Sequence, residues 1–230
     1  VGALVARLTE GMTVALAVRY ASAAGALAVT RLGAQSSLPS RAAVEALVAN
    51  EEGRAPLGYD AKWESTFTAP NGDSFRIRPI LPADAPRLQQ MFAELSPESI
   101  YRRFFTVRKE LTDNEARDLA TVDYRQDFAY VVSPATEPEH LIGVARFAQT
   151  GERPQSVEMA TVIADAYQGR GIGRHLFRIL AETARAQGHR WMMVETQTDN
   201  HPMIDLAQRA GYQTQTSYDG TFIQIWLKLS

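Results

Sequence analysis

The sequence predicts an α/β or α+β domain with a mixed sheet, and three observations lead to this class. Two strand-like runs flank the turn at residues 71–73, whose letters NGD are a strong β-hairpin signal. Apolar runs of strand length then alternate with amphipathic helical runs up to residue 229. At residues 168–173 a glycine-rich loop joins one of these strands directly to a helix. These features predict helices packed against a sheet.

Composition limits the class of protein. The chain has 230 residues, which is enough for one domain and an appendage. The formal net charge of -2 gives no basic excess for nucleic acid, and the most apolar stretch, residues 13–29, is too broken by Arg19 to span a membrane. The absence of cysteine excludes disulfides and a cysteine nucleophile. We therefore expect a cytoplasmic protein without a nucleic-acid or membrane partner.

The first 62 residues differ in pattern from the rest of the chain. Residues 1–50 show helical patterns without strand-like alternation, and Thr13 and Ser40 are candidate N-caps. Residues 51–62 are polar with Gly and Pro and are interpreted as a linker. The sequence therefore predicts a helical segment, a linker and a main domain over residues 63–230.

The main domain begins with the hairpin, whose strands are expected at residues 63–70 and 74–80. In the second of these runs Phe75 and Ile77 alternate with arginines, which predicts one buried face. Helices are then expected over residues 83–95, from Ser96 and Pro97 onward, and from the capping box that Thr112 forms with Glu115.

The second half of the domain alternates more regularly. A helix is expected from the glycine-rich loop to near Gly188, and a shorter one over residues 202–210. Strands are expected over residues 127–132, 140–148, 157–164, 191–196, 212–216 and 221–229.

The glycine-rich loop is suited to holding a phosphate. Glycines let the backbone turn tightly and approach a ligand, and a helix N-terminus offers free N–H groups with partial positive charge. Arg170 and Arg174 add positive charge nearby. A turn that binds nothing is the alternative. The spacing G-x-G-x-G differs from the dinucleotide fingerprint, and the Gly-Lys-Ser/Thr ending of a nucleotide-hydrolysis loop is absent.

The letters QGRGIG at residues 168–173 resemble the acetyl-CoA loop Q/R-x-x-G-x-G/A of the GNAT superfamily of N-acetyltransferases. The resemblance covers residues 63–230 and implies a GNAT-like mixed, mostly antiparallel sheet flanked by helices, with residues 1–50 as a helical appendage. The segments RPILPADAP, LSPESIYRRFF and RKELTDNEARDLATVDY are similar to the bacterial protein lysine acetyltransferases.

This resemblance implies a set of acetyl-CoA contacts. The loop amides would hold the pyrophosphate, and the preceding strand would pair with the pantetheine arm between two splayed central strands. Asn200 matches a position that often contacts the cofactor, although it is also a candidate helix cap before Pro202. The implied cofactor residues are Val162, Ile163, Ala164, Gln168, Gly169, Arg170, Gly171, Ile172, Gly173, Arg174 and Asn200.

Glu158 is the candidate general base. A lysine amine is almost wholly protonated near neutral pH, with a reference pKa of about 10.4, so it must lose a proton before it attacks a thioester. Glu158 lies on the strand leading to the loop, at a position where the lysine acetyltransferases carry a glutamate. The alternative is an ordinary exposed strand carboxylate.

The general acid is left unassigned. Many relatives have a tyrosine four residues before the glycine that follows the last helix, and here that position is Ala207. Tyr212 and Tyr218 are near in sequence but are expected to pack or to face solvent. We expect no metal, because metal-ligand spacing is absent from the four histidines, His140, His175, His189 and His201.

Residues 1–50 resemble the C-terminal end of ribokinase-type sugar kinases. In those enzymes a G-A-G-D motif supplies the catalytic aspartate just upstream, and this chain starts after that point. Sugar phosphorylation is therefore not expected, and we assign these residues a packing role.

The whole pattern predicts an acetyl-CoA-dependent N-acetyltransferase that acts on a protein lysine by direct transfer in a ternary complex. Two alternatives stay open: an acetyltransferase for a small-molecule amine, and a CoA-binding regulatory module without catalysis. The alanine at position 207, in place of a tyrosine, favours the regulatory module, and Glu158 argues against it. The sequence does not predict the oligomeric state.

Overall fold

The computed structural model describes residues 58–230, together with residues 21, 24, 40, 43, 44 and 56. Most of residues 1–50, for which the sequence predicts helices and a resemblance to sugar kinases, and most of the predicted linker lie outside the described residues. The Ser40 cap is confirmed, because its hydroxyl accepts a hydrogen bond from the Ala43 N–H at 3.2 Å. Within the described ranges, no helix combines the length and apolar character that crossing a bilayer requires.

In the described part of the chain, eight strands form one sheet in the order β1-β2-β3-β4-β5-β6-β8-β7. All neighbours pair antiparallel except β5 and β6, which are parallel. The predicted mixed, mostly antiparallel sheet is therefore confirmed. The strands are β1 (Ser65–Thr68), β2 (Ser74–Pro79), β3 (Asp127–Pro134), β4 (Gly143–Thr150), β5 (Ser156–Ile163), β6 (Trp191–Gln197), β7 (Gln213–Tyr218) and β8 (Phe222–Lys228).

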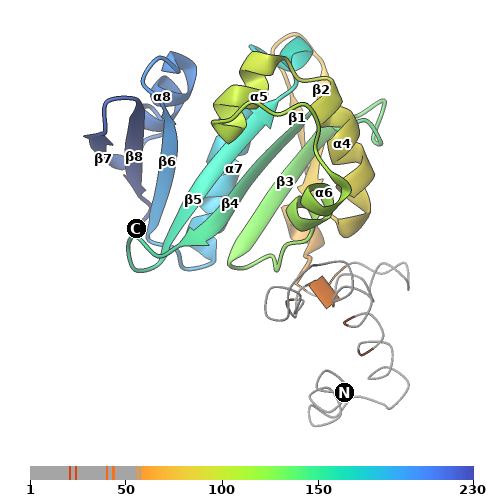
Figure 1. Cartoon of the computed structure of the whole chain (residues 1–230), viewed down its shortest axis with the longest axis horizontal. Helices are drawn as coiled ribbons and strands as arrows, with labels where there is room; N and C mark the ends of the chain where they lie inside the picture. The colour runs from red at the N-terminus through yellow and green to blue at the C-terminus, as the bar shows by residue number, and fades with distance from the viewer. Residues whose placement is uncertain (1–20, 22–23, 25–39, 41–42, 45–55, 57) are drawn as a thin grey trace.

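Helices cover both faces of the sheet (Figure 1). Three of them, α4, α5 and α6, lie on one face, and α7 lies on the other face behind β3, β4 and β5. The core between these layers is apolar and continuous. The helices are α4 (Ala85–Ala93), α5 (Pro97–Phe104), α6 (Asp113–Ala120), α7 (Ile172–Ala186) and α8 (His201–Gln208), and short 3-10 turns occupy Ala61–Trp63, Pro82–Asp84 and Asp165–Tyr167.

Local signals in the sequence set the ends of these elements. Gly72 takes a positive φ of 93° in the hairpin turn, a conformation that glycine adopts without strain. The Ser96 side chain accepts a hydrogen bond from the N–H of Ser99 and so caps α5. Thr112 and Glu115 form the predicted capping box of α6.

A buried ion cluster joins β2 to α4. Asp84 is fully buried, and its carboxylate accepts two hydrogen bonds of 2.7 Å from the Arg78 guanidinium. It also accepts from Arg87 at 2.9 Å and from the Leu81 N–H at 2.8 Å. Burial alone would raise the pKa of Asp84, but these hydrogen bonds and the charge of Arg78 outweigh it and lower the pKa.

Part of the segment interpreted as a linker packs on the domain. The Tyr59 ring meets Tyr124 edge-on with 5.8 Å between ring centroids. The next aromatic side chain, Trp63, meets Phe128 in the same way at 4.9 Å. These contacts place Tyr59 and Trp63 against the start of β3 and the residues before it. The domain boundary at residue 63 stays a prediction.

Candidate active site

A cleft opens where β5 and β6 part. These parallel strands pair only from Ser156 with Trp191 to Met159 with Val194, although both continue further. Beyond that point a cavity of about 500 Å³ lies between α5, β5 and the glycine-rich loop on one side and β6 and α8 on the other. The edge of β5 over residues 160–163 therefore faces the cleft without a strand partner.

The glycine-rich loop turns into α7 at one end of this cleft. Gly169 and Gly171 have positive φ values of 74° and 82°, and Gly171 is the N-cap of α7. The successive backbone N–H groups from Gly169 to Arg174 have no hydrogen-bond acceptor within the described part of the chain. The partial positive charge of the helix end adds to these free donors. The loop therefore presents the geometry that binds phosphate groups.

Two side chains hold this loop in place. The Asp165 carboxylate accepts hydrogen bonds from the Ser96 N–H at 2.9 Å and from the hydroxyls of Ser96 and Ser99 at 2.7 and 2.8 Å. The Gln168 amide donates to the Ile163 carbonyl at 3.0 Å and to the Ser99 hydroxyl at 3.2 Å. The start of α5 and the end of β5 thus fix the loop.

The predicted cofactor residues divide between the cleft and its surroundings. Of those in the 168–174 loop, Gln168, Gly169, Ile172 and Gly173 line the cleft, as do Val162, Ile163 and Asn200. The Ala164 residue lies past the end of β5, where its N–H donates to the Ile142 carbonyl.

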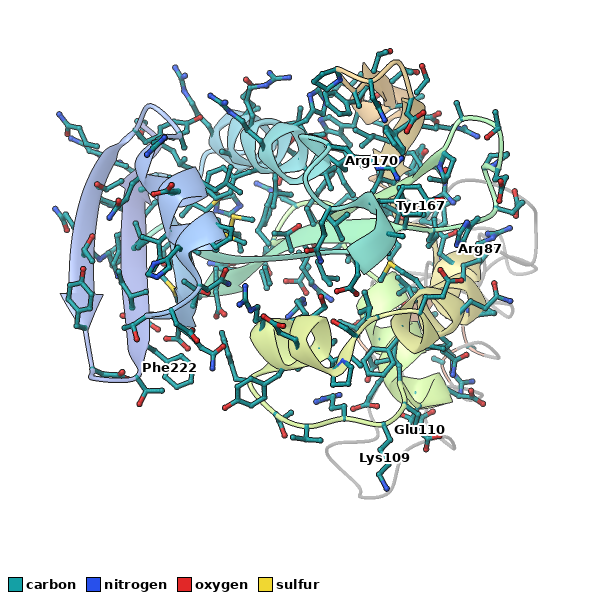
Figure 2. The ribbon with its side chains drawn as sticks, turned by 90° about the horizontal axis from the view of Figure 1, so that it is seen from above. Arg87, Lys109, Glu110, Tyr167, Arg170 and Phe222 are labelled. Carbon is teal, nitrogen blue, oxygen red and sulfur yellow. The ribbon has the colours of Figure 1, made fainter. Side chains whose placement is uncertain are left out.

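Arg170 turns away from the cleft. Its guanidinium pairs with Asp73 at 2.5 Å and lies over the Tyr167 ring, 4.9 Å from the centroid (Figure 2). The remaining members, Gly171 and Arg174, line a second cavity of about 810 Å³ between α7 and α8. Arg178 and Arg209 line this second cavity too, together with Asp205, so arginines outnumber carboxylates in its lining.

Glu158 lies on the cleft wall and remains accessible from it. Its pKa is raised, first by partial burial and then by the negative charge of Glu195 on the neighbouring strand. The nearby Arg103 acts in the opposite direction. A carboxyl with a raised pKa accepts a proton more readily than an ordinary surface glutamate does. The position suits a general base, and the assignment stays a prediction.

Asn200 caps a helix on the far wall of the cleft. Its side chain accepts from the Met203 N–H at the start of α8 and donates to the Thr196 hydroxyl at 2.8 Å. Arg102 on α5 donates to the same side-chain oxygen at 3.4 Å. The helix-cap interpretation is confirmed, and the cofactor contact stays a prediction.

Several charged residues of the cleft do not stand out in the sequence. Glu195 and Arg103 line it beside Glu158, yet Glu195 belongs to an apolar run and Arg103 to a polar helix. The alternation of apolar and polar residues along β6 was the one sequence signal that could have placed Glu195 on an accessible face of the strand. Ala207, the position at which the resemblance leads us to look for a tyrosine, is fully buried, and an alanine side chain offers no donor to the cleft.

We expect Glu195→Gln to move the acid limb of the pH profile of kcat/KM to lower pH. Removing the Glu195 charge lowers the pKa of Glu158, because that like charge is one of the causes that raise it. As the base works deprotonated, its activity then persists to lower pH. Initial rates across the acid range measure the shift. A profile that stays in place would mean that Glu158 does not titrate on this limb.

The fold and the cleft are those of a known family. The chain belongs to the acetyltransferase (GNAT) family, whose sequence model matches residues 90–212. It is 37% identical over 141 residues to the acetyltransferase Pat of Mycolicibacterium smegmatis, covering 61% of this chain and 41% of that protein. It is 32% identical over 171 residues to an acetyltransferase of Pseudomonas aeruginosa, covering 70% of this chain and 91% of that protein.

A solved structure agrees with these sequence relatives. The GNAT domain of S. lividans PAT superposes with a TM-score of 0.67 at 26% identity, covering 74% of this chain and 99% of that domain. The chain thus spans less than half of the M. smegmatis relative and nearly all of the isolated domain. The GNAT fold expected from the sequence is confirmed.

Proposed function

We propose that the protein is an acetyl-CoA-dependent N-acetyltransferase that acetylates a protein lysine by direct transfer in a ternary complex. The observation that carries the proposal is that Glu158 and part of the glycine-rich loop, Gly169, Ile172 and Gly173, line one cleft, and that the N–H groups of these loop residues have no acceptor in the described part of the chain. The cleft opens where β5 and β6 part, so it offers an unpaired strand edge between the loop and the carboxylate.

Acetyl-CoA fits the donor groups on this path. The free N–H groups from Gly169 to Arg174 would hold the pyrophosphate, and the edge of β5 over residues 160–163 would pair with the pantetheine arm. The second cavity, with Arg174, Arg178 and Arg209, offers positive charge for the nucleotide end. A main-chain N–H of β5 would donate to the thioester oxygen as negative charge develops there.

Glu158 would take the proton from the acceptor ammonium group. The neutral amine then attacks the thioester carbon, the C–N bond forms and the C–S bond breaks. The nitrogen loses its second proton as the amide forms, and CoA leaves as a thiolate that takes up this proton through solvent. A lysine acceptor is favoured by the carboxylates of Glu98, Glu158 and Glu195 along the cleft, which attract an ammonium group, and by the similarity to Pat.

A panel of acceptors tests this proposal. We expect CoA thiol release from acetyl-CoA to require a lysine-bearing protein and to be slow with free polyamines. Acetylation of small amines alone would move the protein to a metabolic role. Tight binding of acetyl-CoA without transfer to any acceptor would favour a regulatory module, which the absence of tyrosine at Ala207 would then explain.

A further inference from the structure

A small side cavity next to the cleft contains two arginines in apolar surroundings. Its volume is about 30 Å³, and it lies between β4, β5 and the helices α4, α5 and α6. The charged side chains in its lining are Arg103 and Arg146. The other lining residues are apolar: Leu88, Met91, Phe92, Leu95, Phe104, Leu111, Leu119, Val144 and Val162.

Neither guanidinium has an ion-pair or hydrogen-bond partner among the described residues. Arg103 contacts the Phe104 ring at 4.9 Å, and burial lowers its pKa to about 10, helped by the positive charge of Arg146. Burial also lowers the pKa of Arg146, which Asp127 offsets only in part. Glu158 offsets the charge of Arg103 in part. Two like charges that line one small cavity still favour an anion that joins them.

The side cavity adjoins the cleft and shares two lining residues with it. Arg103 and Val162 line both spaces, and Val162 lies on the strand edge proposed to hold the pantetheine arm. The volume accommodates about two water-sized groups, which is the space that the two oxygens of a carboxylate need. A short chain ending in a carboxylate could therefore leave the cleft and end between the arginines.

The charges along the cleft indicate which substrate carries this carboxylate. Carboxylates outnumber arginines in the cleft lining, and this excess of negative charge disfavours an anionic acceptor; the charged lining residues are Glu98, Glu158, Asp165, Glu195, Arg102 and Arg103. Arg146 lines the side cavity but not the cleft through which the acceptor would enter. The anion is therefore expected on the acyl donor.

We propose that Arg103 and Arg146 form a subsite for the free carboxylate of a dicarboxylic acyl group carried by CoA, such as a succinyl group. This rests on the proposed function and extends its donor class. The transfer breaks the thioester C–S bond and forms an amide C–N bond. An ammonium acceptor thus gives an acylated amine, CoA thiol and one released proton, and the distal carboxylate is unchanged.

Calorimetric titration of the whole chain with succinyl-CoA and butyryl-CoA tests the subsite without an acceptor. Both acyl groups have four carbons, and only succinyl carries a charge. We expect succinyl-CoA to bind about tenfold more tightly or better, and Arg103→Met to reduce this ratio to about one. Arg117→Gln, an exposed change on α6, is the matched control and should keep the ratio.

The wild-type comparison decides the question even if a variant fails to fold. Equal affinities, or tighter binding of butyryl-CoA, would overturn the subsite while leaving acetyl-CoA as the donor. A succinyl preference that survives Arg103→Met and Arg146→Met would also overturn it. If no CoA ester binds, acetyl-CoA included, the proposed function fails together with the subsite.

Discussion

Glu158→Gln is expected to lower kcat by about 10²–10⁴-fold while leaving the affinity for acetyl-CoA nearly unchanged. Glutamine keeps the size of the side chain but cannot take a proton from the acceptor. The groups proposed to hold the cofactor, the loop N–H groups and the β5 edge, are main-chain groups that this change leaves in place. Initial rates with saturating acceptor and a calorimetric titration with acetyl-CoA measure the two effects separately.

Glu110→Gln is the control for this change. Glu110 is exposed between α5 and α6 and points away from the sheet (Figure 2). Its replacement makes the same change of charge outside the cleft and should leave kcat within about twofold. Turnover by Glu158→Gln at the wild-type rate would remove Glu158 from the role of base. Loss of acetyl-CoA binding would show instead that the variant disturbs the cleft.

Asp84→Asn is expected to lower the free energy of unfolding by about 3–5 kcal/mol. The change keeps the shape of the side chain but removes the charge that neutralises Arg78 at the junction of β2 and α4. Arg87 loses the same partner. Denaturant unfolding of both proteins near neutral pH measures the difference.

The same cluster makes the stability of the fold depend on pH, with stability lost towards acid pH. The pKa of Asp84 is lower in the folded protein than its unfolded value of about 3.9, so the carboxylate stabilises the fold above that value. This stability is lost as pH falls through the lower, folded pKa. Asp84→Asn should therefore flatten the acid end of the stability profile.

Glu182→Gln is the control for the ion cluster, because the Glu182 pair with Arg178 is exposed on α7. It should change the free energy of unfolding by less than about 0.5 kcal/mol. If both variants lost the same free energy of unfolding, burial would not determine how much the Asp84 cluster stabilises the fold.

Local chemistry made much of the fold predictable. The NGD turn, the capping box of Thr112 and Glu115, and Ser96 before Pro97 each fix a backbone conformation within a few residues. The strand that carries Glu158 runs directly into the loop at residues 168–173. The order of the two along one wall of the cleft could therefore be predicted from the sequence. The resemblance to the GNAT superfamily supplied the strand splay, which the end of pairing at Met159 and Val194 bears out.

The rest of the site depends on contacts between distant segments. Glu195 reaches Glu158 only because β6 returns beside β5 after α7. Arg103 belongs to a helix whose other arginine, Arg102, pairs with Glu98 at its surface. Only the packing of this helix over the sheet brings Arg103 to the cleft and the side cavity. Arg170 was expected beside the phosphate, but Asp73 from the first hairpin holds it. Single-sequence periodicity contains no information on such pairings.

The most direct test of the central claim is peptide mass spectrometry of a lysine-bearing acceptor protein after incubation with acetyl-CoA and the whole chain. We expect an acetyl group at particular lysines with the wild-type chain and its loss with Glu158→Gln. Equal acetylation by both chains, or none by either while acetyl-CoA binds tightly, would contradict the proposed function.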